Sequence, residues 1–289
     1  MDDLVIVQPD MNNGRKKLDT GKIALIDADK VKYMVTYNCF KDIEKSNGSA
    51  QQRLYEGESL AIKHTKAWVN YFLDRISDPI IFCFSGISKK TFRYDCAIEK
   101  EYKGQRKKDN NDYEGKMDDI LQAMKFIQDN FVTILFEDLE ADDVVAVLQD
   151  DNTYIVSDDK DLKQVPGYHY DHTTNNIFKI EPKDAVDSLA YQLLRGDTVD
   201  NIPGIPGMGD VKTDVFLQDK PTPRKILHVL NKYQQEFGII EGTDRFVETW
   251  NLVKMRIDRG EFFKRRYIKM FDIKESIINQ LKIKGRIKG

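Results

Sequence analysis

The sequence predicts an α/β fold, with a mostly parallel central sheet flanked by helices and a helical C-terminal region. Short apolar runs rich in β-branched and aromatic residues recur along the chain, as in strands buried on both faces. The longer segments between them have apolar residues at helical spacing. Strands that alternate with helices in this way form parallel sheets through right-handed crossovers.

The first half of the chain contains most of these elements. Strands are predicted at residues 23–26, 79–84, 131–136 and 153–156. Helices are predicted at residues 59–76, 116–130, 141–148 and 182–194. Residues 201–209 contain three glycines and two prolines, which predicts a built turn. The remainder, residues 210–289, is predicted to be mostly helical.

The composition is that of a soluble globular protein, with 289 residues of which 40% are apolar and 32% charged. No run of 18 apolar residues occurs, so no membrane span is expected. Three unpatterned cysteines and an acidic start without signal-peptide order predict a cytoplasmic protein. The net charge of −3 hides an asymmetry, because residues 251–289 carry a surplus of eight positive charges. That basic tail could hold duplex phosphates or simply be a solubilising end.

Acidic residues follow three of the predicted strands, at the point where each strand ends. The carboxyl ends of parallel strands open into one crevice, where ligands bind. Two more acids lie three residues apart before the Gly/Pro-rich turn, a spacing that would place them on one helix face. The predicted metal ligands are Asp27, Glu140, Asp142, Asp143, Asp159, Asp161, Asp197 and Asp200.

Eight carboxylates cannot share one crevice unaided. Two unit charges about 4 Å apart repel by roughly 4 kcal/mol at an effective dielectric near 20. Each acid alone is equally well explained as a helix cap or dipole partner, but the series at successive strand ends favours a metal site. Oxygen ligands without His or Cys select Mg²⁺ or Mn²⁺. Two such ions can activate a water and stabilise the leaving oxygen in phosphodiester hydrolysis.

Four motifs together resemble the 5′-nuclease (flap endonuclease) family. They are Asp27 after an apolar strand, Glu140-Ala-Asp142-Asp143, Ser157-Asp158-Asp159-Lys160-Asp161-Leu162, and the stretch LRGDTVDNIPGIPGMG that ends at Gly209. Tyr102-Lys103-Gly-x-Arg106 also matches the family's Tyr-Lys-x-x-Arg motif, and Phe92-Arg93 precedes it. The family includes the 5′-nuclease domain of bacterial DNA polymerase I and the free-standing 5′→3′ exonucleases of bacteriophages, which this chain resembles most in length.

The resemblance implies an α/β core with a helical arch, a helix–turn–helix-like element and two divalent metals. We therefore expect a lead-in at residues 1–20, a nuclease core at 21–181 with the arch near 100–130, and a helical region at 182–289. The metals would be Mg²⁺, with Mn²⁺ able to substitute, and a monovalent cation at the Gly/Pro-rich turn is left open. The implied substrates are 5′-ended strands of flapped, nicked or duplex DNA, and RNA paired to DNA.

The resemblance and the residue types also predict catalytic and DNA-binding roles. The expected catalytic residues are Lys103, Arg106, Asp27 and Asp142. A basic segment with a leading tyrosine suits single-strand contact, and turn glycines before a helix start let backbone approach a phosphate. The expected DNA contacts are Tyr102, Lys103, Arg106, Lys107, Arg93, Gly204, Gly207, Gly209 and Lys212.

Two positions depart from the family pattern. Relatives carry an Asp at the end of the second strand, where this chain has Gly86 beside Ser85. The expected lysine after the turn is Lys212, one residue late. Two alternatives therefore stay open, a non-catalytic module that binds branched DNA and a PIN-type ribonuclease. We expect a monomer that acts on DNA in phage replication or repair, in the bacterial cytoplasm.

Overall fold

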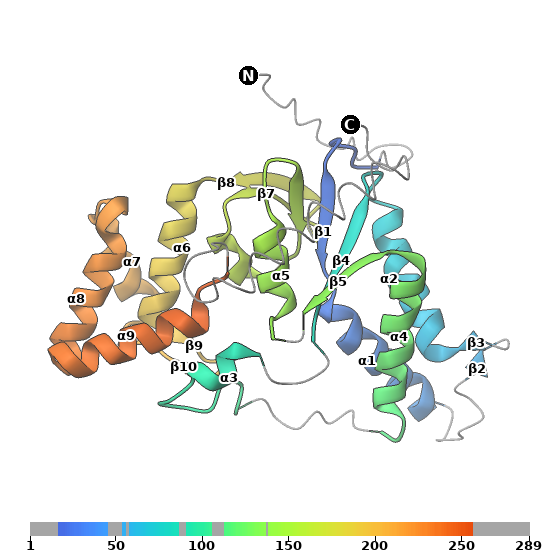
Figure 1. Cartoon of the computed structure of the whole chain (residues 1–289), viewed down its shortest axis with the longest axis horizontal. Coiled ribbons are helices and arrows are strands. Elements are labelled where there is room, and N and C mark those ends of the chain that lie inside the picture. The colour runs from blue at the N-terminus through green and yellow to red at the C-terminus, as the bar shows by residue number, and fades with distance from the viewer. Residues whose placement is uncertain are drawn as a thin grey trace.

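The computed structural model describes residues 17–45, 54–55, 58–86, 91–105, 113–136 and 138–256. Its centre is a six-stranded sheet in the order β5-β4-β1-β6-β7-β8 (Figure 1). The strands are β1 (Ile23–Asp27), β4 (Ile80–Ser85), β5 (Val132–Phe136), β6 (Thr153–Val156), β7 (Gly167–Asp171) and β8 (Asn176–Ile180).

The pairing confirms the predicted mostly parallel sheet. β1 pairs in parallel with β4 on one side and β6 on the other, and β5 and β7 extend the sheet in parallel. Among the described strands of this sheet only β7 and β8 pair antiparallel, and this hairpin lies outside the strands predicted from the sequence. The carboxyl ends of β1, β4, β5 and β6 therefore lie at one edge, as the predicted crevice requires.

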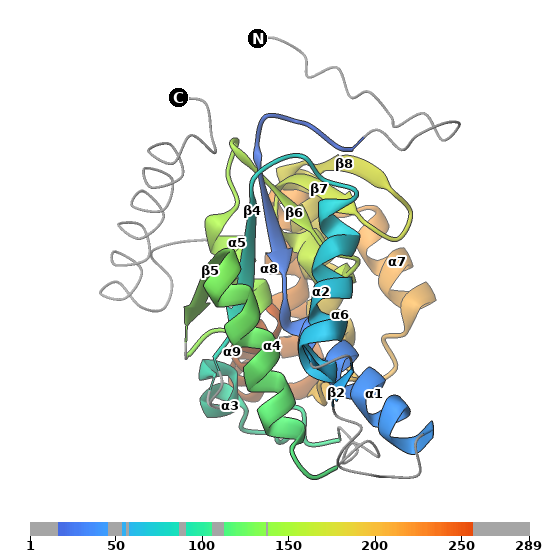
Figure 2. The ribbon, with the colours of Figure 1, turned by 90° about the vertical axis from the view of Figure 1, so that its right-hand side faces the viewer.

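Helices cover both faces of the sheet because alternate strand residues point in opposite directions. Ala24 and Ile26 pack with buried residues of α1 (Asp29–Lys45), α2 (Leu60–Leu73) and α4 (Lys116–Asn130). Leu25 packs on the other face with α5 (Ala141–Leu148). Figure 2 shows α1, α2 and α4 together in front of the sheet.

The predicted arch near residues 100–130 is wrong for its second half. Helix α4 lies on the sheet, with Ala123, Met124 and Ile127 buried in the first core cluster. The apolar residues of α4 recur at helical spacing on one face, and burial of that face holds the helix against the sheet. Residues 106–112 lie outside the described residues.

A third apolar cluster joins the C-terminal helices into one body beside the sheet (Figure 1). Its centre includes Leu193, Leu194, Tyr233 and Leu252, all buried. The helices are α6 (Pro182–Arg195), α7 (Asp210–Gln218), α8 (Lys225–Phe237) and α9 (Ile239–Val253). None of the helices in the described ranges is long and apolar enough to cross a membrane.

Short elements complete the described chain. The pair β9 (Gly196–Asp197) and β10 (Ile202–Pro203) forms a small antiparallel hairpin, and β2 (Leu54–Tyr55) pairs with β3 (Glu58–Ser59). The remaining short helices are α3 (Phe92–Cys96), η2 (Lys160–Gln164) and η3 (Thr222–Arg224).

Candidate active site

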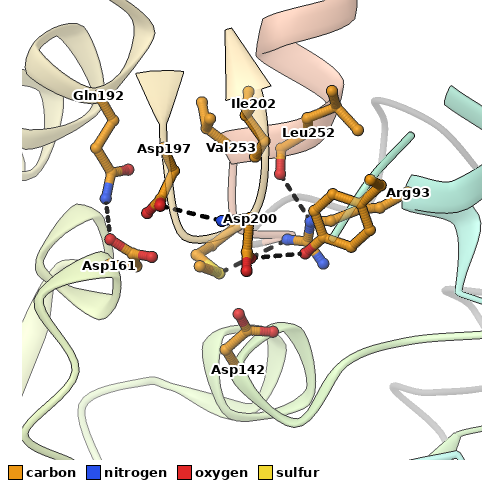
Figure 3. A pocket seen from close by; sticks show the side chains of 11 residues that line it. Arg93, Asp142, Asp161, Gln192, Asp197, Asp200, Ile202, Leu252 and Val253 are labelled. Atoms are coloured by element: carbon orange, nitrogen blue, oxygen red, sulfur yellow. Dashed lines mark hydrogen bonds between the residues drawn. The ribbon is translucent and has the colours of Figure 1, made fainter. Parts of the chain in front are cut away.

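A small pocket lies between the sheet edge and the helical region (Figure 3). Four of the eight predicted acids line it, and they come from three separate segments of the chain. Asp142 comes from α5, Asp161 from η2, and Asp197 and Asp200 from the β9–β10 hairpin. The remaining lining residues are Arg93, Tyr102, Gln192, Ile202, Leu252, Val253 and Met255.

The β9–β10 hairpin, not a helix face, holds Asp197 and Asp200. An Asp197 Oδ1 accepts the backbone N–H of Val199 at 2.7 Å and that of Asp200 at 3.3 Å. An aspartate that accepts backbone N–H groups two and three residues later forms an Asx turn, which stabilises a local reversal of the chain. The expected helical pair at this spacing is therefore wrong, although both carboxylates reach the pocket.

Two more predicted acids, Asp27 and Asp159, do not line the pocket, but their charges influence the pKa values of neighbouring acids. The charge of Asp159 is felt by both Asp27 and Asp161, and the charge of Asp27 is felt by Asp142. Asp159 itself caps η2, because its carboxylate accepts the Asp161 backbone N–H at 2.9 Å. These carboxylates therefore lie within electrostatic range of one another, and their role as metal ligands stays a prediction.

Burial and the close approach of these carboxylates raise their pKa values. Burial, then the neighbouring Asp29, raises the pKa of Asp27 to about 7. Burial, then Asp159 and Asp197, raises the pKa of Asp161 to about 7. Burial, then Asp143, raises the pKa of Asp142 well above its usual range. The site therefore holds more negative charge than its own cations compensate.

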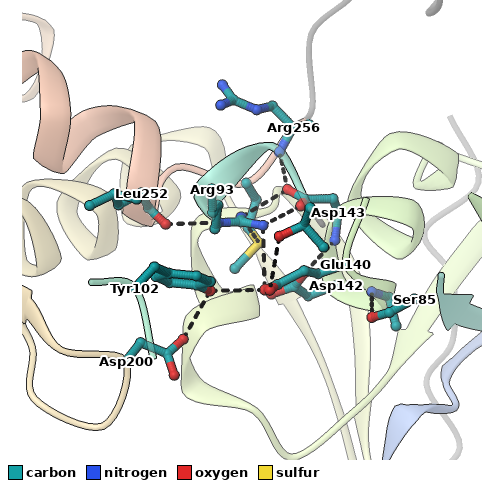
Figure 4. Close-up of polar contacts among 12 residues, drawn as sticks. Ser85, Arg93, Tyr102, Glu140, Asp142, Asp143, Asp200, Leu252 and Arg256 are labelled. Atoms are coloured by element: carbon teal, nitrogen blue, oxygen red, sulfur yellow. Dashed lines mark hydrogen bonds and ion pairs between the residues drawn. The ribbon is translucent and has the colours of Figure 1, made fainter. Parts of the chain in front are cut away.

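Glu140 lies in a different environment from these acids (Figure 4). It precedes α5, and its carboxylate accepts from the Lys103 ammonium at 2.6 Å and from the Tyr102 hydroxyl at 3.0 Å. Burial opposes its ionisation, but the charges of Arg93 and Lys103 lower its pKa. The Tyr102 hydroxyl also lies 3.1 Å from the Asp200 carboxylate. Tyr102 therefore links Glu140, at the start of α5, to Asp200 in the hairpin.

Lys103 faces the acids from a turn rather than from the expected basic helix. Its backbone φ is 59°, and its N–H donates to the Asp200 carbonyl at 2.8 Å. Its ammonium lies 3.9 Å from the Asp200 carboxylate and 4.7 Å from the centre of the Tyr102 ring. Arg106 and Lys107, which were predicted to share its face, lie outside the described residues.

The structure corrects the roles predicted for Arg93 and Asp143. Both side chains are fully buried and form a two-pronged ion pair (Figure 4). Arg93 also donates to the Leu252 carbonyl at 2.8 Å, and Asp143 accepts the Arg256 backbone N–H at 3.1 Å. Arg93 is therefore not a surface DNA contact. Asp143 is completely enclosed and both of its oxygens bind Arg93, so its position does not fit that of a metal ligand.

The remaining carboxylates fit a divalent metal by their chemistry. They are hard oxygen donors without His or Cys, which suits Mg²⁺ or Mn²⁺. Their raised pKa values mark a deficit of positive charge that a cation would fill. Within the described ranges no three of them already converge on one point as a ready-made ion cage.

The Gly/Pro-rich turn uses its glycines in two ways. A Cβ on Gly204 would lie 2.2 Å from the Arg195 carbonyl carbon, and one on Gly196 would lie 2.2 Å from the Ile202 oxygen. Gly204 thus serves close backbone packing, which revises its predicted role as a phosphate contact. Gly207 has a φ of +75°, the left-handed region that favours glycine.

The outer side of this turn is open. A Cβ on Gly209, which precedes α7, would meet nothing within 4 Å. Lys212 is exposed, and its ammonium lies 3.7 Å from where a Gly207 Cβ would stand. The predicted one-residue shift of this lysine therefore does not remove it from the turn. Beside it, Asp210 pairs with Arg195 at 2.8 Å.

Asp29 adjoins the site, although none of the sequence motifs includes it. It lies on the first turn of α1, and its carboxylate accepts the backbone N–H of Ser85 at 3.0 Å. Ser85 ends β4, beside the position where the family pattern has an Asp. The signal available in the sequence was the spacing of Asp29, two residues after Asp27.

Comparison with known proteins identifies the family. A family model described as "5'-3' exonuclease, N-terminal resolvase-like domain" matches residues 22–188. The chain belongs to this family. The match confirms the predicted family and the 5′-nuclease class of function, and the two alternatives are not favoured. Residues 189–289 lie beyond the matched segment.

Curated relatives are named as exonucleases. The 5'-3' exonuclease of Buchnera aphidicola subsp. Acyrthosiphon pisum is 29% identical, over 68% of this chain and 70% of the relative. The exodeoxyribonuclease of Enterobacteria phage T3 is 28% identical, over 65% of this chain and 62% of the relative. With the 5'-3' exonuclease of Mycoplasmopsis pulmonis the match is 32% identical and spans about half of each protein, 48% and 51%.

Solved structures share the fold. The bacteriophage T5 flap endonuclease in a pseudo-enzyme-product complex with DNA and metal ions aligns with a TM-score of 0.57 at 15% identity, covering 88% of this chain and 99% of that one. The T5 5'-exonuclease with bound zinc aligns with a TM-score of 0.55 at 16% identity, covering 81% and 89%. These likenesses extend the shared fold beyond the segment matched by the family model.

Proposed function

We propose that this protein is a Mg²⁺-dependent 5′→3′ exonuclease and flap endonuclease that cuts phosphodiesters near the 5′ ends of DNA. One observation carries the proposal: carboxylates from separate segments, including the β9–β10 hairpin, gather around one pocket, where burial and neighbouring acids raise the pKa values of Asp27 and Asp161 to about 7. Relatives described as exonucleases, and T5 structures with metal ions and with DNA, support it.

The carboxylates form two groups, and each group would hold one metal ion. Asp27, Asp142 and Glu140 would hold one ion near the sheet edge. The other group is Asp159, Asp161, Asp197 and Asp200, nearer to the hairpin. When bound, such ions activate a water and stabilise the charge that develops on the phosphate oxygens. Gln192 donates to Asp161 at 2.5 Å and so fixes the direction of that carboxylate.

Lys103 would act on the scissile phosphate directly, and buried Tyr102 would position it. The Lys103 ammonium lies between Glu140 and Asp200, so it is already at the edge of the acidic pocket. A cation held there, ready before the reaction, stabilises negative charge that develops on a phosphate. The Tyr102 hydroxyl links the same two acids and keeps the lysine's partners in place. Arg106 stays a candidate for a second phosphate contact.

The open side of the Gly/Pro-rich turn would anchor the duplex part of the substrate. Gly207, Gly209 and Lys212 present backbone and an ammonium to solvent at one place. Contacts of this kind bind phosphates, so they position the nuclease without reading sequence. We propose that the protein works as a monomer and also cuts RNA paired to DNA.

A chelator and two neighbouring acids test the metal proposal. EDTA should abolish cleavage of a 5′-labelled flap, and Mg²⁺ or Mn²⁺ should restore it. Asp159→Asn should reduce cleavage by about 10²-fold or more, as expected for loss of an ion that stabilises the transition state. Asp158→Asn is the matched control, because Asp158 pairs with Lys30 instead of joining the acids.

Each outcome has a separate meaning. Cleavage that persists in EDTA would overturn metal dependence. Binding of flapped DNA without cleavage at any Mg²⁺ or Mn²⁺ concentration would favour the non-catalytic module. Preference for single-stranded RNA over flapped DNA would favour the PIN-type ribonuclease. A panel of flap, blunt duplex and RNA–DNA hybrid substrates separates these cases in one assay.

A further inference from the structure

The hydroxyl of Ser85 links the end of β4 to two segments that carry acids near the site, the start of α1 and the start of α5. It lies at the carboxyl end of β4 and donates to the Asp29 carboxylate. It also accepts the backbone N–H of Ala141 at 2.8 Å, which is the first residue of α5 (Figure 4). Ser85 is buried, with 9% of its surface exposed.

Each neighbour of Ser85 stands next to a proposed metal ligand. Ala141 lies between Glu140 and Asp142 in the chain. The Asp29 backbone N–H donates to the Asp27 carboxylate at 3.2 Å. The chain of hydrogen bonds therefore runs from Asp27 through Asp29 and Ser85 to the start of α5.

Asp29 is a positioning group in this chain of contacts, because its oxygens are already occupied. One oxygen accepts the Ser85 N–H at 3.0 Å and pairs with Lys32 at 2.8 Å, and the other accepts the Ser85 hydroxyl. Lys32 also donates to the Ser85 carbonyl at 3.2 Å. Four hydrogen bonds or ion pairs thus hold Asp29 and the end of β4 in one arrangement.

We propose that Asp29 and Ser85 form a relay that sets the spacing between Asp27 and the α5 acids for metal binding. Groups that hold metal ligands in place change metal affinity when removed, although they touch no ion themselves. In this chain the relay takes the place at the end of β4 where the family pattern has an acid. The inference rests on the proposed metal site and adds a positioning role for residues that contribute no ligand.

Loss of the Ser85 hydroxyl should weaken metal binding specifically. Ser85→Ala leaves the Ala141 N–H and one Asp29 oxygen without their partner. We expect the Kd for Mg²⁺, measured by titration calorimetry on the full chain without DNA, to rise about 10- to 100-fold. Ser85→Thr keeps a hydroxyl and should restore most of the affinity. Binding of duplex DNA in EDTA should change by less than about twofold, since phosphate contacts supply it.

A second serine provides the matched control. Ser59 precedes α2, its hydroxyl accepts the Ile62 N–H at 3.2 Å, and neither residue lines the acidic pocket. Ser59→Ala likewise removes a hydroxyl that accepts a backbone N–H of a first helical turn, so it should lower stability and leave the Kd for Mg²⁺ unchanged. An equal change in Kd for both variants would overturn the relay.

Asp29 tests the coupling and keeps the proposal falsifiable if Ser85→Ala folds poorly. Asp29→Ala leaves the Ser85 hydroxyl in place without its acceptor and should raise the Kd for Mg²⁺ in the same direction. The double variant should be little worse than Ser85→Ala alone, because both changes break one chain of contacts. Fully additive effects would mean that Asp29 acts only through its charge, which would overturn the relay.

The wild-type titration separates this inference from the proposed function. If the wild-type protein binds no divalent ion, the proposed metal dependence fails and the relay fails with it. If the wild-type protein binds Mg²⁺ and Ser85→Ala binds it equally well, only the relay fails.

Discussion

Asp142 and Asp143 are neighbours on α5, and the same substitution should have opposite effects on stability at the two positions. Asp143 forms a buried two-pronged ion pair with Arg93, while Asp142 faces other acids in the pocket. Asp143→Asn should therefore destabilise the fold. Asp142→Asn should leave stability unchanged or raise it, because burial, and then neighbouring Asp143, already disfavour the ionised Asp142 carboxylate and raise its pKa.

The magnitude for Asp143 follows from its partners. Breaking a fully buried ion pair by removing one charge costs about 3–5 kcal/mol. Arg93 would keep Glu140 at 3.5 Å and the Leu252 carbonyl at 2.8 Å, so the loss should lie at the lower end, about 3 kcal/mol. With a denaturant slope of about 2.5 kcal/mol per M, the urea midpoint should fall by about 1 M.

Urea unfolding in EDTA, followed by circular dichroism, measures both variants without metal. Asp142→Asn should lie within about 0.5 kcal/mol of wild type or above it, and it should lose cleavage when Mg²⁺ is added. An Asp143→Asn protein with wild-type stability and no cleavage would refute the reasoning. That result would return Asp143 to the role of metal ligand.

Three further predictions follow from the site. Because Asp27 and Asp161 have pKa values of about 7, the folded metal-free protein holds protons that the unfolded chain releases above about pH 4. Its free energy of unfolding should thus fall from pH 5 to 7 in EDTA, level off above 7, and change less with pH in saturating Mg²⁺. Lys103→Ala should slow single-turnover cleavage by about 10²–10³-fold with little change in DNA affinity. The control Lys100→Ala, at an exposed position, should change neither the cleavage rate nor the DNA affinity. Asp210→Asn should tighten duplex binding by roughly threefold, because it frees the paired guanidinium beside the turn for a phosphate.

Specific results would contradict each of these. A metal-free stability that rises from pH 5 to 7 would mean that the two carboxylates are stabilised by partners instead of crowded. Equal rates for Lys103→Ala and Lys100→Ala would place Lys103 on an ordinary basic surface. Unchanged duplex affinity in Asp210→Asn, measured by fluorescence anisotropy in EDTA, would place the turn away from DNA.

The local pattern of the sequence determined the sheet and the acids at its edge. Strands such as β1 and β6 are short apolar runs, and residues that follow parallel strands must meet at one edge. Asp27, Asp142 and Asp161 could therefore be predicted from position alone. The Gly/Pro-rich stretch likewise determined that the chain turns after α6, because proline and glycine cannot continue a regular helix.

Tertiary structure alone decided what each acid does. Asp142 and Asp143 look alike in sequence, but the direction of a helix side chain sends one to the pocket and the other to buried Arg93. Arg93 meets Leu252, 159 residues later, which no local pattern reveals. Asp29 and Ser85 likewise lie 56 residues apart and meet only because β1 and β4 pair in parallel. Partner choice of this kind depends on packing between distant segments, so it becomes visible only in the folded chain.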